Sequence, residues 1–219
     1  MKEEDTKVLS ERKPESYFSA LSKAWEALLT QELEGVSGKS LAQYDSQNNT
    51  FTLKFFGQDY IIQPATKTVT GPDGLEVKPF IAVLLLHYLA YAKELKPEGE
   101  LITFRELEGG DVYYDAFFRR AIKPITDTFG TKAEALREAG KNIGVREEGR
   151  GDCTLVMDVL PKIPVTVTLW EGDDEVPASA NMIFDASIKE LLPTEDVAVI
   201  GGFVASVLIK NRPKWHDNL

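Results

Sequence analysis

The sequence predicts an α+β fold in which largely antiparallel sheets pack against helices. The strand-like runs come in adjacent pairs instead of alternating with helices, which favours hairpins over parallel crossovers. A long apolar helix that begins at a proline follows the strand pairs in each half of the chain. This shared order also allows two similar α+β halves around one core.

The first half of the chain is expected to start with a helix and a hairpin. Apolar residues recur at spacings of three and four over Glu15–Glu34, which predicts an amphipathic helix, and Gly35 is the expected stop. Two β-rich runs follow, separated by a Gly-Gln pair, and they predict a hairpin over Thr50–Phe56 and Asp59–Gln63.

Three helices are predicted in the middle of the chain. Pro79 suits a first helical position and begins a helix that extends to Leu95. This helix is apolar on nearly every side, so we expect it at the centre of a domain. Two further helices are expected near Val112–Ile122 and Lys132–Asn142.

The second half repeats the pattern of strands followed by a helix. Runs rich in β-branched residues predict paired strands over Cys153–Leu160 and Val165–Trp170, with a short strand at Asn181–Phe184. The final helix is expected over Pro193–Ile209, because acidic residues fill its first turn and basic residues lie near its end.

Size and composition predict one globular domain. The chain has 219 residues, of which 43% are hydrophobic and 27% charged; such a chain can bury about 70% of the surface that it exposes when unfolded. We expect a flexible segment at 1–14, a single domain at 15–212 and a tail at 213–219. The glycine-rich stretch 142–151 is the expected place for a subdomain joint.

Charge and cysteine usage exclude several classes of function. The formal net charge of −10 opposes binding to nucleic acid and to anionic membrane surfaces. Cys153 is the only cysteine, so this chain alone cannot build a disulfide or a cysteine-ligated metal site. The charged start lacks the apolar core of a signal peptide, and the apolar run 197–209 is too short to span a bilayer. These features predict a cytoplasmic protein.

An acidic segment after Trp170 is the most suggestive stretch for chemistry. Four carboxylates, Asp173 and Asp174 among them, crowd beside the end of a predicted strand, and Asn181 and Asp185 follow. Hard cations prefer such oxygens, but the spacing of a calcium-binding loop is missing. Solvated turn acids are the alternative, and no metal is assigned.

Basic and histidine side chains supply the other candidates. Arg119 and Arg120 could hold a carboxylate or phosphate in a bidentate manner, or complement the end of their helix. His87 lies in the most apolar helix, where a packed histidine competes with a ligand or a general base. The full set of candidate ligand-binding residues is Trp170, Asp173, Asp174, Asn181, Asp185, Arg119, Arg120 and His87.

Several stretches resemble one known family. The run L-P-K-I-P-V-T-V-T-L-W-E-G-D-D-E-V-P-A-S-A-N-M-I-F-D at Leu160–Asp185 is similar to the family called domain of unknown function 3786. So are L-L-L-H-Y-L at Leu84–Leu89, I-T-F-R-E-L-E-G-G at Ile102–Gly110 and F-F-R-R at Phe117–Arg120. The resemblance implies a redox-linked setting in anaerobic organisms, where some members carry a cysteine-rich iron–sulfur segment. No cysteine precedes Cys153 in this chain, so cluster binding is not implied for it.

Two functions remain open at this stage. The first is a non-catalytic binding or accessory module for a cofactor or a redox protein partner, with the cofactor unknown. The second is an enzyme that acts on an anionic small molecule at a carboxylate and arginine site between the halves, with a metal as a further option. Both require the acidic segment to lie within reach of the arginine-bearing helix. Neither the oligomeric state nor the ligand follows from the sequence.

Overall fold

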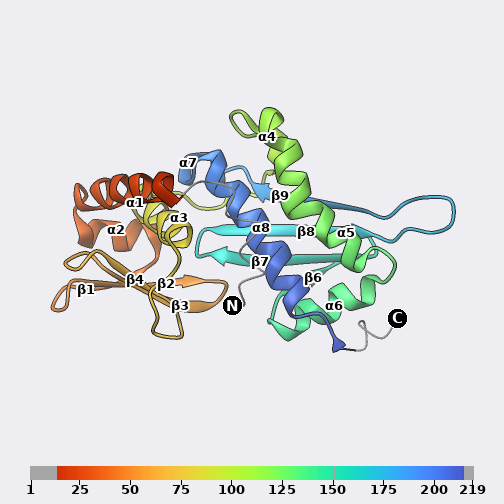
Figure 1. The fold of residues 1–219 in the computed structure, drawn as a ribbon, viewed down its shortest axis with the longest axis horizontal. Coiled ribbons are helices and arrows are strands. Elements are labelled where there is room, and N and C mark those ends of the chain that lie inside the picture. The colour runs from red at the N-terminus through yellow and green to blue at the C-terminus, as the bar shows by residue number, and fades with distance from the viewer. Residues whose placement is uncertain (1–13, 150, 215–219) are drawn as a thin grey trace.

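A computed structural model describes residues 14–149 and 151–214 of the chain. The fold contains two antiparallel sheets, with helices packed on each (Figure 1). The α+β class predicted from the sequence is therefore confirmed. Most of the predicted flexible segment 1–14 and the end of the predicted tail lie outside the described residues.

The first sheet is a meander of four strands in the order β1-β2-β3-β4. Alternate residues of β2 point inward and are buried, namely Phe51, Leu53 and Phe55. The hairpin between β2 and β3 was predicted from the sequence, whereas the two short outer strands were not. The strands are β1 (Gln43–Asp45), β2 (Thr50–Phe55), β3 (Gln58–Gln63) and β4 (Thr68–Thr70).

Three helices pack beside this sheet. The expected helix over Glu15–Glu34 is in fact two, because the chain turns at Thr30–Glu32 and continues as a second helix. Gly35 lies inside that second helix and is not a stop. The next helix begins at the predicted proline but ends five residues earlier than expected, at Ala90 instead of Leu95. The helices are α1 (Pro14–Leu29), α2 (Leu33–Ser40) and α3 (Pro79–Ala90).

The second sheet has five strands in the order β5-β9-β8-β7-β6. Its central hairpin is formed by β7 and β8, and β9 pairs with β8 along its length. Residues 146–148, inside the stretch expected to be a joint, form the edge strand β6. The strands are β5 (Leu101–Thr103), β6 (Arg146–Glu148), β7 (Cys153–Leu160), β8 (Ile163–Trp170) and β9 (Ser179–Asp185).

One face of the second sheet is covered by helices (Figure 1). The predicted helix at Val112–Ile122 is longer than expected, because α4, a π-helical turn and α5 follow one another without a break. The final helix crosses the sheet beside them, and Gly201 allows its backbone to approach Phe117 closely. The elements are η2 (Phe104–Glu106), α4 (Gly110–Phe117), η3 (Phe118–Ile122), α5 (Lys123–Phe129), α6 (Ala133–Asn142), α7 (Ile188–Leu191) and α8 (Thr194–Lys210).

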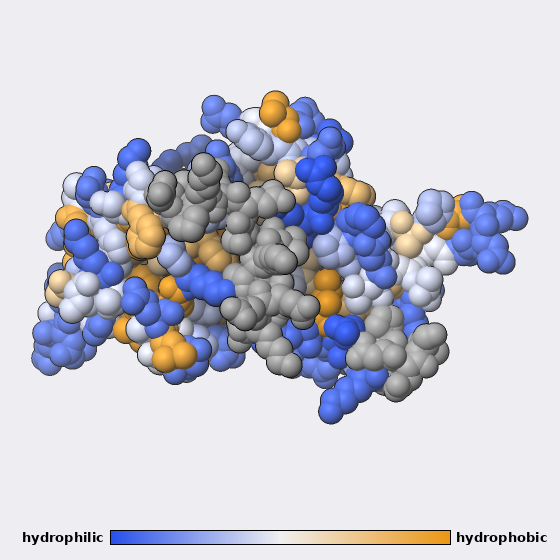
Figure 2. Space-filling model, viewed as in Figure 1, coloured by the Kyte–Doolittle hydropathy of each residue, from blue (hydrophilic) through white to orange (hydrophobic). Residues whose placement is uncertain are grey.

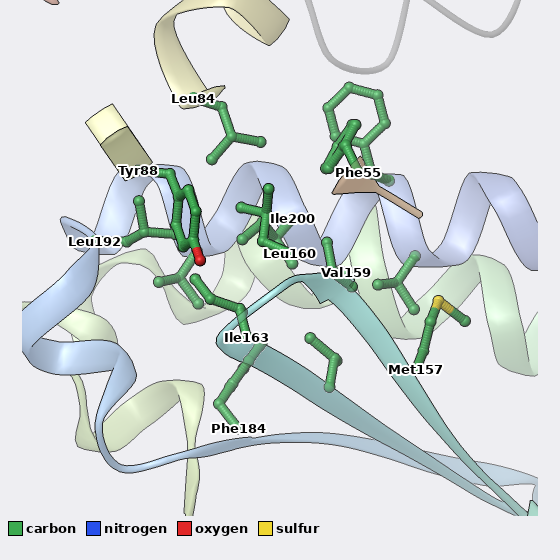
Figure 3. Packing of buried hydrophobic residues seen from close by; sticks show 14 of the residues in the cluster. Phe55, Leu84, Tyr88, Met157, Val159, Leu160, Ile163, Phe184, Leu192 and Ile200 are labelled. Carbon is green, nitrogen blue, oxygen red and sulfur yellow. The ribbon is translucent and has the colours of Figure 1, made fainter. Parts of the chain in front are cut away.

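The two sheets share one hydrophobic core, which Figure 3 shows at the turn between β7 and β8. Phe55 from the first sheet and Phe203 from α8 meet with ring centroids 5.4 Å apart. The backbone N–H of Phe56 donates a hydrogen bond of 2.9 Å to the carbonyl of Val159. Side chains and backbone thus tie the halves into a single interior. No helix among the described residues is long and apolar enough to cross a membrane.

Candidate functional site: a cavity between the two halves

A cavity of about 400 Å³ lies where α1 and α3 of the first half meet α4 and α8 of the second. This volume is in the range of small-molecule sites, which are mainly apolar with a few directed polar groups. Aromatic side chains from four elements form much of the wall. They are Tyr17, Phe80, Phe104, Tyr113 and Phe117.

Arg120 is the one cation among the described residues that line this cavity. It lies in η3, where the N–H of Lys123 bonds to the carbonyl of Phe118, five residues back. Pro124 explains this irregular turn: it has no N–H to donate to the carbonyl of Arg120, so the α-helical bonding pattern cannot continue. Such π-helical turns occur often at functional sites.

The first turn of α8 brings oxygen atoms to the opposite wall. Thr194, Glu195 and Asp196 all line the cavity. Pro193 precedes this turn with an extended backbone, and acidic residues are favoured there because the helix dipole is positive at its start. The cavity therefore combines aromatic walls, one guanidinium and two carboxylates.

Asp196 also connects the two halves. Its Oδ2 lies 2.6 Å from Nδ1 of His87, which comes from the last turn of α3. The side chains are 8% and 18% exposed respectively, so water competes little for this contact. An ionised carboxylate only accepts hydrogen bonds, so the contact places the ring proton of a neutral imidazole on Nδ1 and leaves Nε2 as an acceptor. A histidine oriented in this way occurs both in catalytic dyads and in structural pairs.

Of the residues singled out from the sequence, Arg120 lines the cavity and His87 contacts it through Asp196. Arg119 is exposed and is not among the described residues of the wall. The acidic segment lies elsewhere: the loop between β8 and β9 projects away from the body of the molecule, and its tip is mostly hydrophilic (Figures 1 and 2). The structure thus does not bring Trp170, Asp173 or Asp174 to the cavity.

The acids of the projecting loop serve local structure. Oδ1 of Asp173 accepts hydrogen bonds from the backbone N–H groups of Val176 and Glu175, which lower the pKa of Asp173. Glu171 accepts a hydrogen bond from the N–H of Ala133 at the start of α6. Among the described residues, no group of three or more His, Cys, Asp or Glu side chains could hold a metal ion.

Asp185 is buried at the end of β9 and organises the neighbouring loops. Its carboxylate accepts hydrogen bonds from the backbone N–H groups of Glu98, Gly99 and Ser187, and from the Ser187 hydroxyl. Burial raises the pKa of this carboxyl, but the four hydrogen bonds outweigh burial and the pKa is lowered overall. Asn181, by contrast, accepts a hydrogen bond from its neighbour Met182 in the same strand.

Sequence reasoning missed most of the cavity wall. In the sequence, Phe80 and Phe104 look like ordinary core residues, and only the three-dimensional arrangement of α3 and η2 brings them to one cavity wall. The acids at the start of α8 were noted, but as helix-start residues. Nothing in the sequence shows that residue 196 meets residue 87.

The fold is of the α+β class, and a cavity of ligand size lies between its two halves. The family model described as "Domain of unknown function (DUF3786)" matches residues 32–207, and the chain belongs to that family. The resemblance seen in the sequence is thereby confirmed. Neither the comparison with curated proteins nor that with solved structures found a match.

Proposed function

We propose that this protein is a non-catalytic binding domain for an organic anion with a flat, apolar body. The cavity between the halves carries the proposal, because aromatic rings line its walls and Arg120 supplies a positive charge. Flat apolar ligands pack well against aromatic side chains. A guanidinium offers five N–H donors in a planar fork, so it can bind a carboxylate or phosphate in a bidentate manner.

A narrower form of the proposal is that the ligand is a cofactor of anaerobic metabolism. Alternatively, the surface around the cavity binds a redox protein partner of such metabolism. The family resemblance motivates both, and flavin mononucleotide has the required ring system and phosphate. We further propose a cytoplasmic location and no nucleic-acid partner, for which the support is the net charge of −10 and the single cysteine.

The proposal is tested by measuring binding of an aromatic carboxylate, an aromatic phosphate and flavin mononucleotide. Ligand at 100 times its Kd stabilises the folded state by about 2.7 kcal/mol, which for a chain of this length raises Tm by roughly 5–10 °C. Arg120→Gln is expected to weaken binding about tenfold or more, because it removes a charged hydrogen-bond donor.

Arg119→Gln is the matched control, since Arg119 is the adjacent guanidinium but is exposed and outside the described wall. It is expected to leave the Kd within twofold of the wild type. Equal losses in both variants, or no binding of any probe, would contradict a binding function at this cavity.

The second candidate is an enzyme that acts on an anionic small molecule, and the His87–Asp196 contact favours it. In this version His87 is a general base that Asp196 orients, and Arg120 holds the substrate. The test is turnover of any ligand that binds: His87→Gln should abolish turnover while the Kd changes little, whereas a bound ligand that stays unchanged for hours argues for the binding domain.

A further inference from the structure

A second cavity, of about 510 Å³, adjoins the first. Its walls come from the loop between η2 and α4 and from the link between α7 and α8. Three residues line both cavities, namely Tyr113, Thr194 and Glu195. The two cavities are therefore neighbouring parts of one groove along the starts of α4 and α8.

Tyr113 lies at the junction of the two parts and is 51% exposed. The surrounding backbone is fixed, because the hydroxyl of Thr194 donates a hydrogen bond of 2.8 Å to the carbonyl of Glu108. This bond holds the η2–α4 loop against the first turn of α8. A hydrogen bond between the two walls thus supports the groove, and Tyr113 is the aromatic side chain that borders both of its parts.

The two parts differ in charge. Arg120 lines only the first part, seven residues after Tyr113 along a continuous helical segment, which corresponds to roughly 10 Å. Glu108 lines only the second part, and Glu195 lines both. Asp196 lines the first part as well, where it contacts His87. The guanidinium is thus confined to the first part, whereas the carboxylate of Glu108 belongs to the second and that of Glu195 lies at the junction.

The other charged groups of the second part have partners. Glu190 forms an ion pair of 2.6 Å with Lys93. Lys189 is close enough to Glu106 to lower its pKa, in addition to the larger effect of two hydrogen bonds from Thr103. Within the described part of the chain, neither Glu108 nor Glu195 has a side-chain partner, so the net character of this end is acidic.

We infer that the groove binds one elongated zwitterionic ligand, with its anionic group at Arg120, its apolar body beside Tyr113 and an ammonium group at Glu108 and Glu195. The inference rests on the proposed function and narrows its ligand class. A simple organic anion would fill only the first part. The added ammonium group can form ion pairs with the carboxylates of Glu108 and Glu195, which a simple anion would leave exposed to water.

Three probes with the same rigid body test this inference: biphenyl carboxylate, the same acid with a hydroxymethyl group on the far ring, and the same acid with an aminomethyl group there. Calorimetric titration at low salt should show the aminomethyl acid binding about threefold to fivefold tighter than the hydroxymethyl acid, the range expected of exposed ion pairs. Glu108→Gln combined with Glu195→Gln should abolish this difference. Glu108→Gln alone, at a residue that lines only the second part, should reduce the difference and leave the affinity for the plain acid within twofold.

Glu34→Gln is the control for Glu195→Gln, because Glu34 is likewise an exposed acid in the first turn of a helix, α2, and lines neither cavity. It should keep the full preference for the aminomethyl acid. Equal affinities of the aminomethyl and hydroxymethyl acids in the wild type would overturn the inference, as would a preference that survives in the double variant.

The two proposals fail separately. If the plain acid binds and depends on Arg120 while the ammonium group adds nothing, the binding function stands and the zwitterionic ligand is wrong. If none of the three acids binds, but flavin mononucleotide does, the binding function again stands and the zwitterionic ligand is again wrong. If no probe of either experiment binds, both proposals are wrong.

Discussion

Nδ1 of His87 and Oδ2 of Asp196 lie 2.6 Å apart, although 109 positions separate the two residues in the chain. The contact joins the last turn of α3 to the first turn of α8 and so links the two halves beside the cavity. The stability of the fold and the geometry of the cavity therefore depend in part on the same pair.

Breaking this pair should destabilise the protein. Asp196→Ala leaves the imidazole of His87 without its acceptor in a place that water hardly reaches, so we expect a loss of about 1–3 kcal/mol in the free energy of unfolding. Urea denaturation of the two single variants and the double variant with His87→Ala measures the coupling. A coupling energy near zero would show that the contact contributes nothing.

Asp185 should contribute a pH-dependent part of the stability. Its folded pKa lies below the ordinary value of 3.8, so the carboxylate stabilises the fold above that value and loses this effect as pH falls through the lower folded pKa. Asp185→Asn is therefore expected to cost about 2–3 kcal/mol at pH near 7. The difference in the free energy of unfolding between wild type and variant, measured by urea denaturation, should become smaller in acid. A difference that stays constant with pH would contradict the lowered pKa of Asp185.

Cys153 should react slowly in the folded protein. The thiol is buried, and burial raises its pKa from 9.0 to about 11, so at pH near 8 very little of the reactive thiolate is present. A disulfide reagent that releases a coloured thiolate should label the native protein far more slowly than the urea-unfolded chain. Equal rates would show that the sulfur is accessible.

Gly201 should tolerate no side chain. An added Cβ would lie 2.5 Å from Cε2 of Phe117, so Gly201→Ala is expected to cost about 1–3 kcal/mol through overpacking between α8 and α4. Gly38→Ala is the control, since a Cβ there meets nothing within 4 Å and alanine favours a helix by up to about 1 kcal/mol. Thermal denaturation of both variants should give shifts of opposite sign.

The sequence predicted the local elements better than their arrangement. Pro79 and the apolar run after it located α3, the acidic first turn and basic end located α8, and the Gly-Gln pair located the hairpin of β2 and β3, because these signals act over a few residues. The short outer strands were missed. Gln43–Asp45, for example, has only three residues, and it is stabilised by its pairing with β2, which the local sequence does not show. The break at Thr30–Glu32 was hidden by apolar residues that continue on both sides.

The candidate site was only partly accessible to the same reasoning. Arg120 and His87 were singled out by residue type and local context, and the structure places both at or beside the cavity. Asp173 and Asp174 were singled out by density of charge, yet they lie on a projecting loop whose acids bond to nearby backbone. Long-range packing decides which carboxylate lies near which cation, and this cannot be deduced from composition.

The cavity draws its walls from α1 near one end of the described chain and from α8 near the other. A growing polypeptide on the ribosome thus cannot offer a finished site until its final helix has emerged and docked. Occupancy by a ligand would accordingly report that α8 has docked, and a protein cut before α8 should be unable to bind even if its first half kept its shape.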